Sequence, residues 1–337
     1  MVAPNDSGVA LWQADLSSER RPDGTLVVRQ TRPLPSYPAK ITERLVHFAQ
    51  TTGERTWMAQ RGADGGWRHV TYAEALRTAR RIGTGLLKLG LSADRPILIL
   101  SGNSLEHALL VLGAYYVGIP FAAISPAYSL VSTDHAKLKD IAATMTPGLV
   151  FADDGARFDA AIAASFDTDV PVLSVRNVAA ERGIAFASLA ATTAGAEADA
   201  AHEAISPDTI AKFLFTSGST GSPKPVIQTQ RLLCSNQAMV LDCYAFMAKT
   251  PPVVVDWAPW NHTASGNKVF NLVLYNGGSY YIDEASRARR VSPKRSGTCA
   301  RSRRPGTSTC RLATRCWLRR WRRTRPCESG SSRACRC

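Results

Sequence analysis

The sequence up to residue 284 predicts an α/β protein with mostly parallel sheets covered by helices. Short apolar segments typical of strands alternate with helical segments between residues 96 and 215. That alternation is typical of parallel strands with helices on both faces of the sheet. The segment is also long enough to bury one large core or two smaller ones.

A hairpin and a capped helix are the first predicted elements. Residues 55–60 and 67–71 flank a glycine-rich turn, which is typical of two antiparallel strands. Thr71 and Glu74 have the spacing of a capping box, which opens a helix. Gly90 is placed to end that helix. Its apolar residues repeat at helical spacing and are Ala75, Ala79, Ile82, Leu86 and Leu89.

An uncharged stretch covers residues 107–124. Gly118 and Pro120 interrupt it, and proline breaks the interior of a helix. A membrane-spanning helix needs about 20 residues without such a break. The sequence therefore predicts a buried helix from Ser104 to about Val117, followed by a buried strand over residues 121–124, and no membrane association.

The remaining elements continue the alternation. Strands are predicted at residues 96–100, 148–151 and 170–175, and helices from Ser132 and over residues 157–165. Residues 190–203 are rich in Ala, Thr and Gly and are predicted to form a surface excursion.

The N-terminus and the cysteines indicate a compartment. The first 20 residues lack a basic segment followed by an apolar core, so no secretory signal is expected. Only Cys234 and Cys243 precede residue 285, which fits the reducing cytoplasm. We expect residues 1–35 to be an N-terminal extension and residues 36–284 to form the folded domain. Nothing in the composition indicates an oligomeric state.

Residues 285–337 differ sharply from the rest. Of the 41 basic and 27 acidic side chains of the chain, sixteen Arg, one Lys and one Glu lie in this segment, which leaves 24 basic and 26 acidic residues before it. Six of the eight cysteines also lie here, without a C-x-x-C pair, so a structural zinc site is poorly supported. A dense arginine cluster can bind nucleic acid through its phosphates.

The codon pattern favours another interpretation of this tail. Among its residues only Val291, Lys294, Leu312, Leu318 and Glu328 require A or T at the second codon base. A strong preference for G or C is typical of the third codon base in GC-rich genes. Here it is found at the second base, as if one base had been lost and the former third base had moved to the middle of each codon. When the codons of residues 307–317 are read one base earlier, they are compatible with the amino-acid sequence Y-F-N-V-P-x-G-Y-E-M-L. We therefore predict an out-of-frame, disordered tail without a specific nucleic-acid ligand; a genuine basic domain is the alternative.

The segment TSGSTGSPK follows a predicted strand at residues 209–215. Its glycines permit positive φ and close approach of the backbone, so that successive N–H groups can point at one anion. Hydroxyl groups add donors and the lysine adds a positive charge, which suits a polyphosphate; a flexible linker is the alternative. The NTPase P-loop is excluded, because it needs adjacent Gly-Lys. The expected phosphate-binding residues are Thr216, Ser217, Gly218, Ser219, Thr220, Gly221 and Lys224.

At this loop the chain resembles the adenylate-forming (AMP-binding) superfamily of acyl- and aryl-CoA synthetases, whose signature is close to T-S-G-[ST]-T-G-x-P-K-G. Residues 97–129 and 255–267 resemble two further blocks of the family, and the resemblance covers nearly all of residues 36–284. The segments KPVIQTQRLLCSNQAM and DWAPWNHT are most similar to the feruloyl-CoA synthetase branch. Pro225 and Gln230 depart from the common pattern of Gly and His.

The resemblance implies a two-step ligase that uses ATP, Mg²⁺ and coenzyme A to activate an aromatic carboxylic acid. It implies the fold of a truncated N-terminal domain of these enzymes, with His262 lining the acyl pocket. A structural histidine beside Trp257 and Trp260 is the alternative. The family's Y-G-x-T-E and T-G-D strings are absent, so no catalytic residue or metal ligand is identifiable and an inactive chain is expected. Two alternatives remain for the function: a ligase of the same superfamily that acts on a fatty or benzoic acid, and a non-enzymatic protein that binds nucleic acid through its basic tail.

Overall fold

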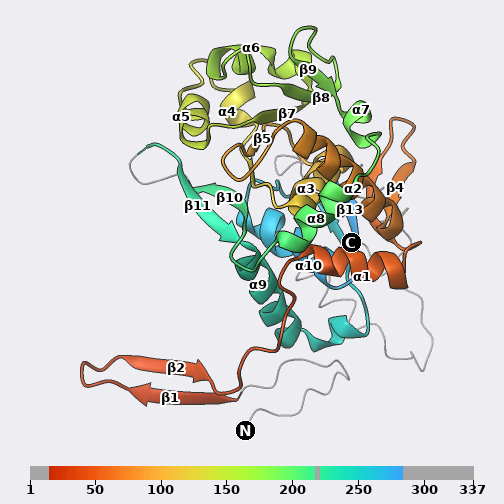
Figure 1. The fold of residues 1–337 in the computed structure, drawn as a ribbon. Coiled ribbons are helices and arrows are strands. Elements are labelled where there is room, and N and C mark those ends of the chain that lie inside the picture. The colour runs from red at the N-terminus through yellow and green to blue at the C-terminus, as the bar shows by residue number, and fades with distance from the viewer. Residues whose placement is uncertain (1–14, 217–220, 284–337) are drawn as a thin grey trace, which may run out of the picture.

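The computed structural model describes residues 15–216 and 221–283, which form two larger sheets and a separate hairpin (Figure 1). The hairpin pairs strands β1 (Leu16–Arg20) and β2 (Leu26–Gln30), and both are largely exposed. It lies within the predicted N-terminal extension, whose first 14 residues fall outside the described part. The predicted out-of-frame tail, residues 285–337, also falls outside the described residues.

A seven-stranded sheet is the larger of the two and has the order β11-β10-β6-β5-β7-β8-β9. Each neighbouring pair is parallel except β10 with β11, which is antiparallel. This confirms the predicted mostly parallel sheet. The strands are β5 (Ile97–Ile99), β6 (Phe121–Ala123), β7 (Leu149–Asp154), β8 (Val172–Arg176), β9 (Gly183–Ala185), β10 (Ile210–Thr216) and β11 (Lys224–Thr229).

Helices cover both faces of this sheet, as alternate side chains of its central strand show. Ile97 and Ile99 join one apolar core, whereas Leu98 and Leu100 join another on the opposite face. Such two-sided burial is the reason that these strands are apolar throughout. The first face is covered by α2 (Tyr72–Lys88) and α3 (Leu105–Val117), and the second by α5 (Ala136–Met145) and α6 (Gly155–Ser165).

A four-stranded sheet shares the core of α2 and α3 and has the order β12-β13-β3-β4. Its antiparallel pair, β3 (Thr56–Arg61) and β4 (Trp67–Thr71), is the predicted hairpin. Strands β12 (Val253–Asp256) and β13 (Ser279–Ile282) complete it in parallel. The remaining elements are α1 (Thr42–Thr51), α4 (Ala127–Leu130), α7 (Phe186–Ala190), α8 (Ala196–Ala204), α9 (Gln230–Cys243), α10 (Phe270–Tyr275), the 3₁₀ turn η1 (Ala245–Ala248) and the π-helix η2 (Ala264–Val269).

The uncharged stretch at residues 107–124 folds as predicted. Ser104 caps α3 by accepting a hydrogen bond from the His107 backbone, and Gly118 ends the helix with φ of 71°. Strand β6 follows directly. No helix of the described residues is both long and apolar enough to cross a membrane.

The prediction of a surface excursion at residues 190–203 is wrong for its second half. Helix α8 forms there, with Ala198 and His202 buried. Asp199 accepts hydrogen bonds from Arg80 and Tyr116, which dock the helix on α2 and α3. The prediction took the alanines of this segment as typical of a loop. Alanine has the highest helix propensity of the residues, so these alanines favour a helix.

The capping box of α2 supplies a first testable prediction. The Glu74 N–H donates to Thr71 Oγ1 over 3.2 Å, and the Thr71 N–H donates to Glu74 Oε2 over 2.9 Å. Replacing Thr71 with alanine removes the first bond and is expected to lower the free energy of unfolding by about 1 kcal/mol. Urea unfolding measures the change, with Thr133→Ala at an exposed loop position as the control. Equal stabilities of the two variants would contradict the role of the cap.

Candidate functional site

The predicted phosphate loop joins β10 to β11. Thr216, the last residue of β10, is paired in register with Lys224, the first residue of β11, and its hydroxyl donates to the Lys224 carbonyl over 3.4 Å. Gly221 has φ of 98°, which glycine adopts without strain. Among the described residues, apart from its chain neighbours, no atom lies within 4 Å of the position that a Cβ would take there. The other four predicted residues, 217–220, lie outside the described part of the chain.

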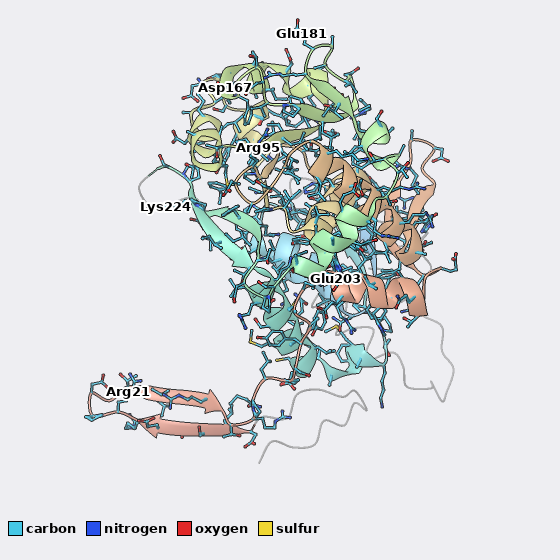
Figure 2. All side chains as sticks on the ribbon, viewed as in Figure 1. Arg21, Arg95, Asp167, Glu181, Glu203 and Lys224 are labelled. Atoms are coloured by element: carbon cyan, nitrogen blue, oxygen red, sulfur yellow. The ribbon has the colours of Figure 1, made fainter. Side chains whose placement is uncertain are left out.

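The loop leaves the carboxyl edge of the parallel sheet. Strand β10 runs parallel to β6, so Thr216 points to the edge where β5, β6 and β7 also end. Ligands of open α/β sheets bind at this edge. Ser222 donates to Asp140 Oδ2 of α5 over 2.9 Å, and the exposed Lys224 lies at the outer end of β11 (Figure 2).

The segment around His262 follows β12. The His262 side chain is exposed, so it does not pack in the core beside Trp260. The histidine that does so is His107 of α3, whose ring centroid lies 4.9 Å from that of Trp260. The His262 carbonyl accepts from the Gly266 N–H over 2.8 Å, which ties it to the π-helix η2.

Two hydrogen bonds bring the phosphate-loop hairpin and the His262 segment together. Lys212 Nζ of β10 donates to the Gly266 carbonyl of η2 over 2.9 Å. Asn267 Nδ2 donates to Gln228 Oε1 of β11 over 3.0 Å. The structure therefore places the elements of the two predicted sites side by side, although no direct contact joins Lys224 and His262.

A buried carboxylate holds the start of the His262 segment. Asp256 is fully buried at the end of β12, and its Oδ2 accepts from Ser265 Oγ at 2.6 Å and from Tyr280 OH at 2.8 Å. Its Oδ1 accepts from the Ala258 N–H at 2.9 Å. Burial and the neighbouring Asp256 raise the pKa of Tyr280 well above its usual value, so Tyr280 remains a donor.

Asn103 connects this segment to the carboxyl end of β5. Its Nδ2 donates to the Ala258 carbonyl over 2.8 Å, and its Oδ1 accepts from the Trp260 N–H at 3.0 Å. One side chain from the large sheet thus fixes the backbone of the loop that leads to His262.

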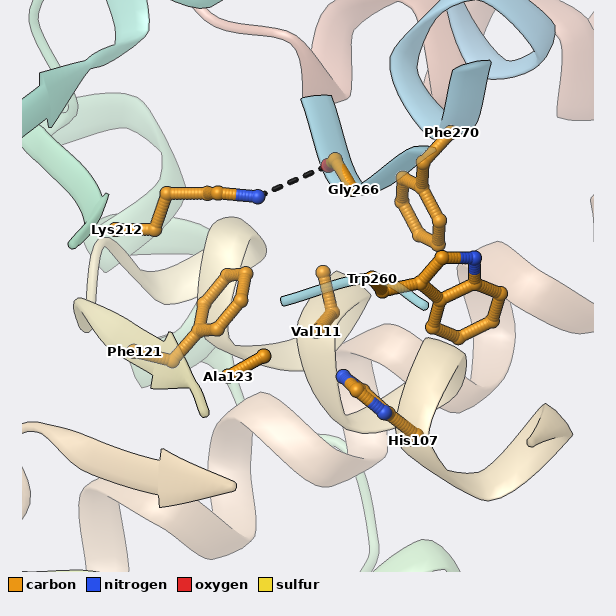
Figure 3. Close-up of a pocket in the computed structure, with 8 residues that line it drawn as sticks. All are labelled: His107, Val111, Phe121, Ala123, Lys212, Trp260, Gly266 and Phe270. Atoms are coloured by element: carbon orange, nitrogen blue, oxygen red, sulfur yellow. Dashed lines mark hydrogen bonds between the residues drawn. The ribbon is translucent and has the colours of Figure 1, made fainter. Parts of the chain in front are cut away.

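A small cavity is lined by Trp260 and Gly266, which precede and follow His262 in the chain (Figure 3). Its volume of about 10 Å³ is roughly that required by one water molecule. Burial lowers the pKa of Lys212 to about 7, and no carboxylate of the described residues forms an ion pair with this amine. Burial also lowers the pKa of His107 to about 4. The lining residues are His107, Val111, Phe121, Ala123, Lys212, Trp260, Gly266 and Phe270.

The sequence interpretation missed Lys212 and His107. A signal was available for Lys212, because it is a lone charge in the otherwise apolar strand TIAKFLF. No such signal marks His107. Among the described residues, no three His, Cys, Asp or Glu side chains gather as a metal site.

Comparisons with known proteins show which family the chain resembles. A model of the family "AMP-binding enzyme" matches residues 45–302. The match ends beyond residue 284, where the change of reading frame is predicted, and that change stays a prediction. A 4-coumarate–CoA ligase of Vanilla planifolia is 29% identical over 175 residues, covering 51% of this chain and 30% of the ligase. A long-chain-fatty-acid–CoA ligase of Mycobacterium tuberculosis is 32% identical over 179 residues, covering 51% and 28%.

The fold is also found among solved structures. The luciferase-like enzyme of the mealworm Zophobas morio superposes with a TM-score of 0.61 at 13% identity, over 83% of this chain and 61% of that enzyme. At such identity the likeness shows the fold alone. The alignments with the two CoA ligases span less than a third of the ligases' own length. Since the family model matches more than half of this sequence, the chain belongs to the AMP-binding enzyme family, whose adenylate-forming fold it shares.

Proposed function

We propose that this chain is part of an ATP-dependent ligase that activates a carboxylic acid as an acyl-adenylate and transfers the acyl group to coenzyme A. The observation that carries the proposal is the loop between Thr216 and Lys224 at the carboxyl edge of the sheet, inside the segment that matches the AMP-binding family. In the first step a carboxylate oxygen attacks the α-phosphorus of ATP and pyrophosphate leaves. In the second step the thiol of coenzyme A attacks the acyl carbon and AMP leaves.

The proposed role of the loop is to stabilise negative charge on the phosphates. Backbone N–H groups, hydroxyl groups and Lys224 would donate to the β- and γ-phosphates, where preorganised donors are most effective. His262 would form part of the wall between the acyl pocket and the nucleotide. The described residues provide no cluster of His, Cys, Asp or Glu side chains that could hold Mg²⁺.

For the acid, we propose an aromatic substrate of the feruloyl or hydroxycinnamoyl type. The motifs around Lys224 and His262 support it, and so do the 4-coumarate–CoA ligases among the relatives. The fatty-acid ligase relative supports a long-chain acid as the second candidate. Acid-dependent pyrophosphate exchange, measured with a frame-restored gene product, distinguishes the two. Pyrophosphate exchange with ferulate and not with a fatty acid supports the aromatic substrate. Exchange with a fatty acid and not with ferulate supports the long-chain acid.

We further propose that the 337-residue chain does not complete the reaction. Its sequence contains neither a Y-G-x-T-E string for adenine and magnesium nor a T-G-D string for ribose. We expect no acyl-CoA from the purified chain supplied with Mg-ATP, coenzyme A and ferulate, measured by absorbance of the thioester and by mass spectrometry. Thioester above the level of a heat-denatured control would contradict this expectation.

A further inference from the structure

We propose that Lys212 is a positioning residue that couples the strand of the phosphate loop to the segment that carries His262. The inference rests on the proposed function, because it concerns the communication between the nucleotide loop and the wall of the acyl pocket. Lys212 is buried, so the role proposed for it is to position other groups and not to bind a substrate.

The coupling follows a short chain of bonded groups. Lys212 lies on β10, four residues before Thr216, where the phosphate loop begins. Its Nζ donates to the Gly266 carbonyl over 2.9 Å, and the Gly266 N–H donates to the His262 carbonyl over 2.8 Å. A displacement of the end of β10 would therefore act on the backbone of His262 through a single residue, Gly266.

The cost of burying this amine argues against a packing role alone. Lys212 is 3% exposed, and its aliphatic stem could be replaced by an apolar side chain of similar length. A buried amine without a carboxylate has a large desolvation penalty. The Gly266 carbonyl and the Phe121 ring, whose centroid lies 5.4 Å from Nζ, offset part of it. We infer that the amine is present for the bond that it makes to η2.

The acceptor lies in an unusual helix. Gly266 belongs to the π-helix η2, and a side chain at Gly266 would overlap the Trp260 carbonyl. Short π-helical segments are frequent at functional sites and mark positions under local constraint. Lys212 and the Asn267–Gln228 bond hold this helix from β10 and β11, the two strands that flank the phosphate loop.

Hydrogen exchange measured by mass spectrometry tests the coupling. The variant Lys212→Met keeps an unbranched apolar side chain about as long as the lysine stem and removes the donor. Without ligand, we expect amides of residues 264–270 to exchange about 2- to 10-fold faster, as expected for the loss of one hydrogen bond, with residues 97–99 unchanged. Lys268→Met, an exposed lysine in the same helix, is the matched control and should leave the exchange unaltered.

A second arm adds tripolyphosphate. In the wild type, binding should protect residues 216–224 and also 264–270. In Lys212→Met the protection of 216–224 should persist and that of 264–270 should be weaker, because only the Asn267–Gln228 bond of the two then remains. Equal protection of 264–270 in both chains, or unaltered exchange without ligand, would overturn the role of Lys212. Absence of protection at 216–224 in the wild type would overturn the proposed phosphate site itself. If Lys212→Met does not fold, the wild type still decides, because protection at 216–224 without protection at 264–270 excludes coupling.

Discussion

Raising the pH from about 7 to about 10 is expected to stabilise the fold through Lys212. Burial lowers the pKa of this amine from 10.5 to about 7 in the folded state. Between these values the unfolded chain binds more protons than the folded chain, so the free energy of unfolding rises with pH. Below about pH 7 both states are protonated and the whole penalty is present. One pKa unit corresponds to about 1.4 kcal/mol, so the gain is on the order of 3–5 kcal/mol.

The comparison of wild type with Lys212→Met isolates this effect. Other groups that titrate in this range are common to both chains, and their contributions cancel in the difference. His107, the other titratable group lining the cavity, has its pKa lowered to about 4 and does not change charge in this window. Urea unfolding between pH 6 and 10 should show a steeper rise for the wild type than for Lys212→Met. Parallel curves would show that burial does not lower the pKa of Lys212 in the folded chain.

Replacing Asp256 with alanine is expected to lower the free energy of unfolding by about 3 kcal/mol or more. The substitution leaves three buried donors without their acceptor, namely Ser265 Oγ, Tyr280 OH and the Ala258 N–H. Each buried donor left unsatisfied costs about 1–3 kcal/mol. The segment that carries His262 should also lose order, because Ala258 and Ser265 lie on either side of His262 and both bond to Asp256.

Thermal and urea unfolding of the wild type and three variants measures this effect. Asp256→Asn keeps one carbonyl acceptor and should be intermediate between the wild type and Asp256→Ala. Asp159→Ala removes an exposed carboxylate of α6 and should change the stability by no more than about 0.5 kcal/mol. An Asp256→Ala variant as stable as Asp159→Ala would show that the buried carboxylate does not organise the segment.

Local signals account for the part of the fold that the sequence predicts. The capping box at Thr71, the glycine that ends α3 and the apolar strands of the large sheet each depend on neighbours within a few residues. Helix α8 differs from the prediction because Thr and Gly at residues 192–195 precede it and are typical of a loop, although its own alanines favour a helix. Its contact with Arg80, more than a hundred positions earlier in the chain, makes it part of the fold.

The candidate site is predictable only in part for the same reason. The phosphate loop has a local pattern, and the structure places its two ends, Thr216 and Lys224, in register. The contacts of Lys212, His107 and Asp256 depend on how β10, α3 and β12 meet in three dimensions. No spacing in the sequence specifies those meetings, and the π-helix η2 has no recognisable sequence period.

Binding of ATP to the phosphate loop is the central claim, and calorimetric titration of the purified chain with Mg-ATP tests it most directly. The variants Lys224→Ala and Lys249→Ala each remove one exposed positive charge, and both retain the arginine-rich residues 285–337. A charge-assisted hydrogen bond contributes about 1.5–3 kcal/mol, so Lys224→Ala should bind about 10- to 100-fold more weakly than the wild type. Lys249→Ala should bind like the wild type. Equal affinity of all three chains would contradict a nucleotide site at this loop.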